Sequence, residues 1–326
     1  MTSDLRTVSD FLLNLYLAAQ QHAPDQFQRE TLLSLQRFLP FDFAGWGGGT
    51  QESRKVTDVT MLHQSPDFFS EWEKVAHRDE YCDLALARLN RTVLFDDVPE
   101  FRRSFAYNEH WRLFDVRNMI ATIMLEPVDG YVTFMGLCAS DPLQRYTEEH
   151  RALKQLLMPH VCSALRLNRR SVLDRIDAPG DGIAVVDRAG RVLASRPPFW
   201  SIVREEWAGA RTSIPLAVER EPHATAWSWR GNAIQLHAQP LGHHHVLRAS
   251  LRSPLECLTA REAEIIEHVV RGNSHKEVAR LLELAPATVR NHLAKVHDKL
   301  GISTRAELVR ACMADRPSPR RRRAGR

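Results

Sequence analysis

The sequence predicts a multidomain protein in which an α/β region over residues 1–250 precedes an all-α domain of four short helices. Three observations lead to this fold class. The chain has 326 residues, which is enough for two or three domains at ~100–200 residues each. Residues 41–139 contain runs of β-branched and aromatic residues between turn signals, a pattern typical of strands. Residues 258–313 instead carry apolar residues at helical spacing between cap residues, which predicts short helices.

The first domain is expected over residues 1–170. It opens with two helices in residues 1–40, whose apolar residues share faces at helical spacing: Phe11, Leu12, Leu15 and Leu32, Leu35, Leu39. Strands are expected over 41–48, 55–63, 92–98, 119–128 and 131–139, with helical pieces over 66–90 and 100–115. A long helix from Thr147 to Ile176 closes the domain, because acidic residues stand in its first turn. The glycine cluster GWGGGT at 45–50 lacks the following helix and lysine of a phosphate loop, so we interpret it as a turn.

A second, smaller α/β domain is expected over residues 172–250. The stretch DGIAVVDRAGRVLAS has two apolar runs around an Asp-x-x-Gly turn, which predicts a hairpin. A short helix over 199–207 and three strands over 223–230, 232–241 and 243–252 follow. At most two of His243, His244 and His245 can converge from a strand, and no acidic or cysteine ligand stands nearby in the sequence. No metal site is therefore expected there.

The third domain, over residues 254–313, carries the most specific pattern. Capping boxes at 259–262 and 274–277 open two helices. Pro286 stands at the first position of a third helix, and Gly301 ends it. Four short helices, of which the second and third are joined by a tight turn, predict a helix-turn-helix. Such a unit lays the later helix of the pair in the major groove of DNA.

The third helix of this domain has two distinct faces. Val289, Leu293 and Val296 form an apolar face that holds the helix to its scaffold, and Arg290 and Asn291 are left on the other face. An arginine can donate two hydrogen bonds to guanine O6 and N7, and an asparagine can bond adenine in a similar way. We therefore expect the polar face to contact double-stranded DNA.

The stretch LTAREAEIIEHVVRGNSHKEVARLLELAPATVRNHLAKVHDKLGISTRAELV resembles the DNA-binding domain of LuxR-type (GerE/NarL-like) transcriptional regulators. The resemblance covers Leu258 to about Met313 and implies a set of base-facing and phosphate-facing residues: Ser274, Lys276, Thr288, Arg290, Asn291, His292, Lys295 and Lys299. It also implies a homodimer, with contacts through the last helix, and RNA polymerase as a further partner. Two positions depart from the family pattern, because Ala285 replaces a Ser or Thr helix cap and His275 replaces an Asn.

The order of elements in the front domains resembles two sensor folds. Residues 1–170, with their long closing helix, are similar to a GAF-like domain, and residues 172–250 are similar to a reduced PAS-like domain. Such domains hold a small molecule over a sheet, or only dimerise. The candidate ligand-binding residues are four aromatic side chains, whose alternative role is to fill the core: Trp46, Phe69, Trp72 and Trp111.

Two other inputs are disfavoured by the residues present. Acyl-homoserine-lactone receptors have the pattern Trp-x3-Tyr-x8-Asp, and from Trp72 this chain places Ala76 and Ala85 at those spacings. A phosphorelay receiver would need an acidic pocket near its first strand, which the N-terminal sequence does not supply.

Composition and charge exclude several classes of protein. No stretch approaches the ~18 apolar residues of a membrane span, and the N-terminus lacks the pattern of a signal peptide, so a cytoplasmic protein is expected. The net charge of +4 arises in the Arg-rich tail, residues 314–326, which alone carries +5 and is expected to be disordered. The five cysteines form no C-x-x-C pair, and no nucleophile elbow or Gly-rich phosphate loop appears. No cofactor and no enzymatic activity are expected.

These features together predict a dimeric, sequence-specific transcriptional regulator of bacterial type. Its front domains are expected to bind a small-molecule effector and to control the helix-turn-helix. The alternative is a regulator without a ligand, whose front domains are controlled by a partner protein.

Overall fold

The computed structural model describes residues 5–127, 130–215, 226–252 and 254–314. The chain divides into two compact units, Met1–Ser250 and Leu251–Arg326. The first unit is an α/β region with two antiparallel sheets, and the second is helical, in agreement with the fold class expected from the sequence. Within the described residues, no helix has the length and apolar character needed to span a bilayer. The Arg-rich tail expected to be disordered lies almost wholly outside the described residues.

The first sheet has five strands in the order β2-β1-β5-β4-β3, and each neighbouring pair is antiparallel. Its strands are β1 (Phe43–Thr50), β2 (Val56–Leu62), β3 (Thr92–Leu94), β4 (Asn118–Leu125) and β5 (Tyr131–Ala139). All five were expected, although β3 is shorter than predicted because the chain turns at once into the 3-10 helix η2 (Phe95–Asp97).

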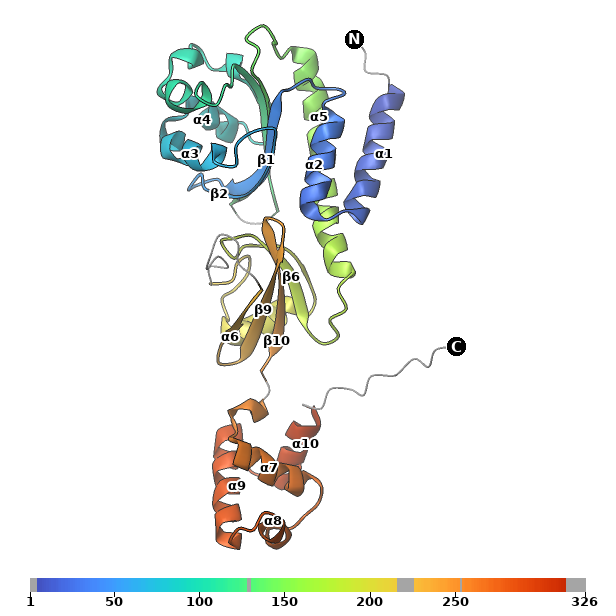
Figure 1. The fold of residues 1–326 in the computed structure, drawn as a ribbon, viewed down its shortest axis with the longest axis vertical. Coiled ribbons are helices and arrows are strands. Elements are labelled where there is room, and N and C mark those ends of the chain that lie inside the picture. The colour runs from blue at the N-terminus through green and yellow to red at the C-terminus, as the bar shows by residue number, and fades with distance from the viewer. Residues whose placement is uncertain (1–4, 128–129, 216–225, 253, 315–326) are drawn as a thin grey trace. The chain divides into compact units, whose positions relative to one another are not determined.

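Helices cover both faces of this sheet (Figure 1). One face packs against α1 (Leu5–Gln21), α2 (Pro24–Leu35) and the long α5 (Glu148–Asp174). The other face packs against α3 (Phe68–Val75), η1 (Ala76–Arg78) and α4 (Glu80–Ala87). The helical pieces expected over 100–115 are the 3-10 helix η3 (Phe101–Arg103) and the π-helical η4 (Tyr107–Trp111). Each face therefore has its own hydrophobic cluster.

The glycine cluster at 45–50 is a strand and not the expected turn. β1 runs through all three of Gly47, Gly48 and Gly49, and pairs on both sides with β2 and β5. A Cβ atom at Gly48 would collide with the hydroxyl of Tyr131, and a Cβ atom at Gly47 would collide with the backbone of β2. Glycine is needed here for close approach of neighbouring groups, a reason that composition alone does not distinguish from a turn.

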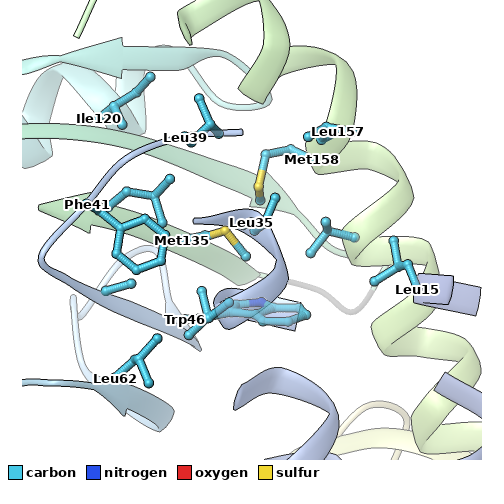
Figure 2. Close-up of a cluster of buried hydrophobic side chains, with 14 of the residues drawn as sticks. Leu15, Leu35, Leu39, Phe41, Trp46, Leu62, Ile120, Met135, Leu157 and Met158 are labelled. Carbon is cyan, nitrogen blue, oxygen red and sulfur yellow. The ribbon is translucent and has the colours of Figure 1, made fainter. Parts of the chain in front are cut away.

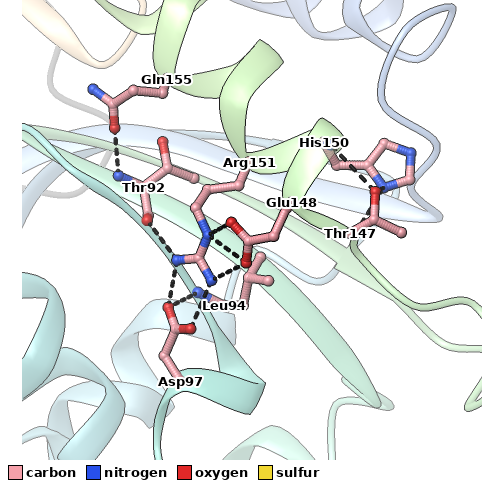
Figure 3. Close-up of polar contacts among 8 residues, drawn as sticks. All are labelled: Thr92, Leu94, Asp97, Thr147, Glu148, His150, Arg151 and Gln155. Carbon is pink, nitrogen blue, oxygen red and sulfur yellow. Dashed lines mark hydrogen bonds and ion pairs between the residues drawn. The ribbon is translucent and has the colours of Figure 1, made fainter. Parts of the chain in front are cut away.

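The long helix α5 is anchored at its N-terminus by polar contacts to β3 and η2 (Figure 3). Thr147 caps the helix by accepting the N–H of His150. Arg151 donates two hydrogen bonds of 2.6 Å to the carboxylate of Asp97, a third of 3.0 Å to the Thr92 carbonyl, and others to Glu148. These bonds hold the pKa of Asp97 below its usual value. A bidentate pair of this kind fixes orientation as well as distance, so it sets the angle at which α5 crosses the sheet.

The second sheet follows α5 and has the order β7-β6-β10-β9-β8. Its strands are β6 (Gly182–Val186), β7 (Val192–Arg196), β8 (Trp227–Arg230), β9 (Ile234–Leu241) and β10 (His244–Leu251), with α6 (Phe199–Glu206) packed on one face. The expected hairpin, helix and three strands are present within the described residues, and residues 223–225 of the strand expected over 223–230 lie outside them. The C-terminal end of α5 packs against this sheet too, since Leu173 shares a cluster with Ile183 and Val185.

A buried ionic cluster joins the two sheets. Asp58 of β2 accepts a 2.5 Å hydrogen bond from the Tyr131 hydroxyl and a 3.3 Å bond from Arg169 of α5, and its other neighbour is His244 of β10 at 2.9 Å. Burial by itself would raise the pKa of Asp58, but His244, Arg169 and Tyr131 together hold that pKa below its usual value. His244 thus has an acidic partner that lies 186 positions away in the chain, which its sequence neighbourhood could not indicate.

The second unit begins with the 3-10 helix η5 (Pro254–Cys257). It continues with α7 (Ala260–Val270), α8 (His275–Leu281), α9 (Pro286–Leu300) and α10 (Arg305–Ala314). Its core contains Ile265 and Val269 of α7, Val278 of α8, Val289 of α9 and Leu308 of α10. The four helices lie at the positions expected from their cap signals.

Candidate DNA-binding surface and ligand cavity

The caps of the second unit determine where its helices begin. Thr259 and Glu262 form a capping box at α7, and Ser274 and Glu277 form another at α8. α9 begins at Pro286 without a side-chain cap, because Ala285 has no oxygen to offer, and it ends at Gly301, whose φ is +62°. These local signals place α8 and α9 on either side of a short turn.

The outer face of α9 is polar and accessible. Val289, Leu293 and Val296 are buried in the unit's core, whereas Arg290, Asn291 and Lys295 are exposed. Thr288, one position before Val289, is half-buried. An α-helix with a buried apolar stripe and an exposed row of long donors can enter the major groove and place those donors at base edges.

The four expected phosphate contacts differ in their surroundings. Ser274 and Lys276 are exposed at the start of α8, and His292 is half-buried. Lys299 is placed differently from the expectation, because its Nζ lies 2.6 Å from Oε2 of Glu262, whose side chain is almost fully buried. The hydrogen bond from Lys299, with that from the Thr259 N–H, lowers the pKa of Glu262 to about 2. A phosphate would have to compete with this carboxylate, so Lys299 acts first as a tie between α7 and α9.

The first unit contains an apolar cavity of about 90 Å³ between its first sheet and the helices α3, α4 and η4. Three of the four aromatic residues expected to bind a ligand line it, namely Phe69, Trp72 and Trp111. The other lining residues include residues of β4, β5 and α4: Met119, Ala121, Ile123, Val132, Phe134, Gly136, Tyr81, Cys82, Ala85 and Leu86.

Trp46 does not line this cavity. Its indole lies on the opposite face of the sheet, in the cluster under α1, α2 and α5, where its ring centroid is 5.7 Å from that of Phe27 (Figure 2). Successive residues of a strand point to opposite faces, so one step in register decides which cluster a side chain joins. Trp46 fills the cluster under α1, α2 and α5, so it stands apart from the three aromatic residues that line the cavity.

Asp79 is a residue of this site that the sequence argument did not single out. Its Oδ2 accepts the indole N–H groups of Trp72 at 2.8 Å and Trp111 at 3.0 Å, while its Oδ1 accepts the backbone N–H groups of Tyr81 and Cys82. Burial raises its pKa above the usual value. The available signal was local, because an aspartate just before Glu80-Tyr81-Cys82 is a typical N-cap; its bonds to two tryptophans were not readable from sequence.

Comparison with known proteins decides the assignment of the second unit. The family described as bacterial regulatory proteins, luxR family, matches residues 256–312. Residues 256–312 are a luxR-family helix-turn-helix domain. The matching family consists of transcriptional regulators and not of enzymes.

Curated relatives match the luxR-family domain alone. The chain is 39% identical over 59 residues to the probable transcriptional regulatory protein NarL of Mycobacterium tuberculosis, a match of 18% of this chain and 27% of that protein. It is 41% identical over 56 residues to the probable transcriptional regulatory protein SgaR of Hyphomicrobium methylovorum, which is 17% of this chain and 26% of that protein. The chain thus spans about a quarter of the length of the curated relatives it matches.

Two solved structures are similar over larger parts of the chain, at low scores. Escherichia coli SdiA aligns with a TM-score of 0.40 and 10% identity, over 94% of this chain and 97% of that one. The VqsR LBD domain from Pseudomonas aeruginosa aligns with a TM-score of 0.38 and 16% identity, over 50% of this chain and 96% of that one. At such scores the first unit has to be understood from its own contacts.

Proposed function

We propose that this protein is a transcriptional regulator that binds a specific DNA sequence through α9 of its luxR-family domain. The proposal rests on one observation: Arg290, Asn291 and Lys295 are exposed on one face of α9, while the opposite, apolar face is buried in the core of the unit. In it, Arg290 and Asn291 read base edges, with Thr288 and Lys295 beside them. Ser274, Lys276 and His292 meet phosphates and set the register of α9 on the duplex.

The regulator acts as a homodimer on a near-palindromic site. One helix of this size reads only a few base pairs, and a second copy one helical turn away supplies the remaining specificity. Two half-sites about 34 Å apart are therefore expected. RNA polymerase is the machinery whose recruitment or exclusion such a protein would control.

The first unit is the sensor in this proposal, with a GAF-like domain around the first sheet and a reduced PAS-like domain around the second. The cavity lined by Phe69, Trp72 and Trp111 supports this role, since an apolar pocket against a sheet is the usual form of a small-molecule site. A ligand bound there would act on α3 and α4 directly, and through the sheet on α5.

The experiment selects duplexes from a random pool with the full chain and then measures affinity for the selected site. Arg290→Ala should weaken specific binding by ~1–3 kcal/mol, which is roughly 5- to 150-fold in Kd, and relax the preference at one base pair. Arg290→Lys keeps the charge but loses the two-donor fork, so it should lose the base preference while the salt dependence stays unchanged. Selection of no duplex, or an Arg290→Ala variant with unaltered preference, would remove the assigned surface.

A further inference from the structure

In the interior of the cavity in the first unit, the indole N–H groups and the tyrosine hydroxyl are already bonded within the protein. Both indole N–H groups, of Trp72 and Trp111, are given to Asp79. The Tyr81 hydroxyl donates to the Val93 carbonyl at 2.9 Å. A polar ligand group placed between these walls would lose its water without gaining a partner. The buried part of a ligand is therefore hydrocarbon.

The mouth of the cavity has the opposite character. It lies at the turn between β1 and β2, where Thr50, Gln51, Arg54 and Lys55 line it. Among the described residues that line the cavity, the cationic side chains are those of Arg54 and Lys55, and none is acidic. A ligand that enters tail-first leaves its head beside these cations.

The two cations have different surroundings. Arg54 donates to Asp83 at 2.5 Å and to the carbonyl of Ala76, so it holds the turn against α4 and η1. Lys55 is exposed. One carboxylate oxygen of the nearby Glu73 accepts the backbone N–H of Val56 at 2.8 Å. Lys55 is thus the side chain placed to meet a charged head group.

The volume limits the length of the tail. The cavity holds about 90 Å³, which is smaller than the ~150 Å³ apolar cavity that accommodates benzene. A chain of a few carbon atoms fits this space, and a long acyl tail does not.

We propose that the effector is an aliphatic monocarboxylic acid with a short chain, whose tail lies between Trp72, Trp111 and the sheet and whose carboxylate pairs with Lys55. This inference rests on the proposed sensing function and specifies its ligand class. The apolar walls of the cavity favour a hydrocarbon tail, and the cations at its mouth favour a negatively charged head group. The volume of the cavity limits the tail to a short chain.

The test uses the purified full chain at neutral pH, with unbranched carboxylates of two to eight carbons and the primary alcohols of equal length as probes. Calorimetric titration gives Kd, and the shift in thermal unfolding gives an independent readout. Carboxylates should bind about two- to fivefold more tightly than the matched alcohols, because solvent screens an ion pair with an exposed lysine, and the optimum should lie at short length.

Two lysine variants locate the head group. Lys55→Met should weaken carboxylate binding about two- to fivefold, the range typical of a solvent-exposed ion pair, and leave alcohol binding as it was. Lys74→Met is the matched control, because Lys74 of α3 is also exposed but pairs with Glu71 and does not line the cavity. It should change neither class of probe.

A third variant fills the cavity. Ala85→Leu places a larger side chain among the lining residues and should abolish binding of both acids and alcohols. Its unfolding temperature and DNA affinity without probe report whether the variant is folded. Should Ala85→Leu fail to fold, Ala121→Val fills the same cavity from the strand side.

The outcomes separate the ligand class from the sensing function itself. If the alcohols bind as well as the acids, or if Lys55→Met has no effect on the acids, the carboxylate assignment is wrong while sensing by this cavity stands. If no probe binds at millimolar concentration while the wild type remains folded and binds DNA, the proposed sensing by this cavity is overturned as well.

Discussion

Asp58→Asn tests whether the buried ionic cluster holds the two sheets of the first unit together. The amide keeps the size of the side chain but removes the charge that faces Arg169 and His244. Arg169 is 2% exposed, so its buried guanidinium would lose the carboxylate that bonds to it and keep the electrostatic interaction with Glu126. Removal of one partner from a buried ion pair costs ~3–5 kcal/mol. For a unit of this size that is a fall of roughly 6–20 °C in Tm, at ~2–4 °C for each kcal/mol.

Differential scanning calorimetry of the full chain measures this effect, with Asp96→Asn as the matched control. Asp96 also pairs with arginines, Arg102 and Arg145, but its side chain is half exposed, so its loss should cost at most ~1 kcal/mol. Adding Arg169→Met to Asp58→Asn removes the stranded charge and should recover part of the stability. An equal loss of Tm in Asp58→Asn and Asp96→Asn would refute the reasoning.

The same cluster predicts a pH dependence. Because the folded pKa of Asp58 lies below its unfolded value of about 3.9, the stability it contributes is fully present above that pH and is lost as the pH falls towards the folded pKa. The difference in unfolding free energy between wild type and Asp58→Asn should therefore narrow below about pH 4.

Three further changes have expected outcomes. Burial lowers the pKa of Lys154 from 10.5 to about 7, so between these pH values the unfolded chain binds one more proton than the folded chain. The unfolding free energy of the wild type should therefore rise with pH across this range. Lys154→Met should flatten the rise in denaturation curves measured at several pH values, and an unchanged slope would contradict the prediction. Leu293→Ala opens the core behind α9 and should cost ~2–5 kcal/mol in denaturant unfolding of the second unit, with a cost below that range indicating a poorly packed helix. Deletion of residues 317–326 removes five arginines and should weaken binding to all duplexes alike and reduce the salt dependence, which fluorescence anisotropy at several salt concentrations would detect; an unchanged salt slope would show that these arginines do not meet phosphates.

The luxR-family domain could be predicted almost completely because its signals are local. A capping box such as Thr259–Glu262 involves residues three positions apart, and the faces of α9 follow from the helical repeat around Arg290 and Val289. The expected strands of both sheets were recognisable for the same reason. The glycine cluster at 45–50, which we interpreted as a turn, was the exception. Glycine is required there because the Tyr131 hydroxyl, about 80 residues away in sequence, leaves no room for a Cβ atom at Gly48.

The sequence by itself determined which segments are helices and strands, and which helix faces DNA in the proposal. Only the tertiary structure decided that Trp46 lies on the face of the first sheet that α1, α2 and α5 cover. It also decided that Asp79 accepts the indole N–H groups of both Trp72 and Trp111. The pairing of Lys299 with Glu262 was decided in the same way. The tertiary structure also decided the candidate cavity, whose walls come from β1, β2, β4, β5, α3, α4 and η4. Local structure depends on neighbours within a few residues. A buried ion pair or a cavity instead depends on how distant segments pack, and that information is spread over the whole chain.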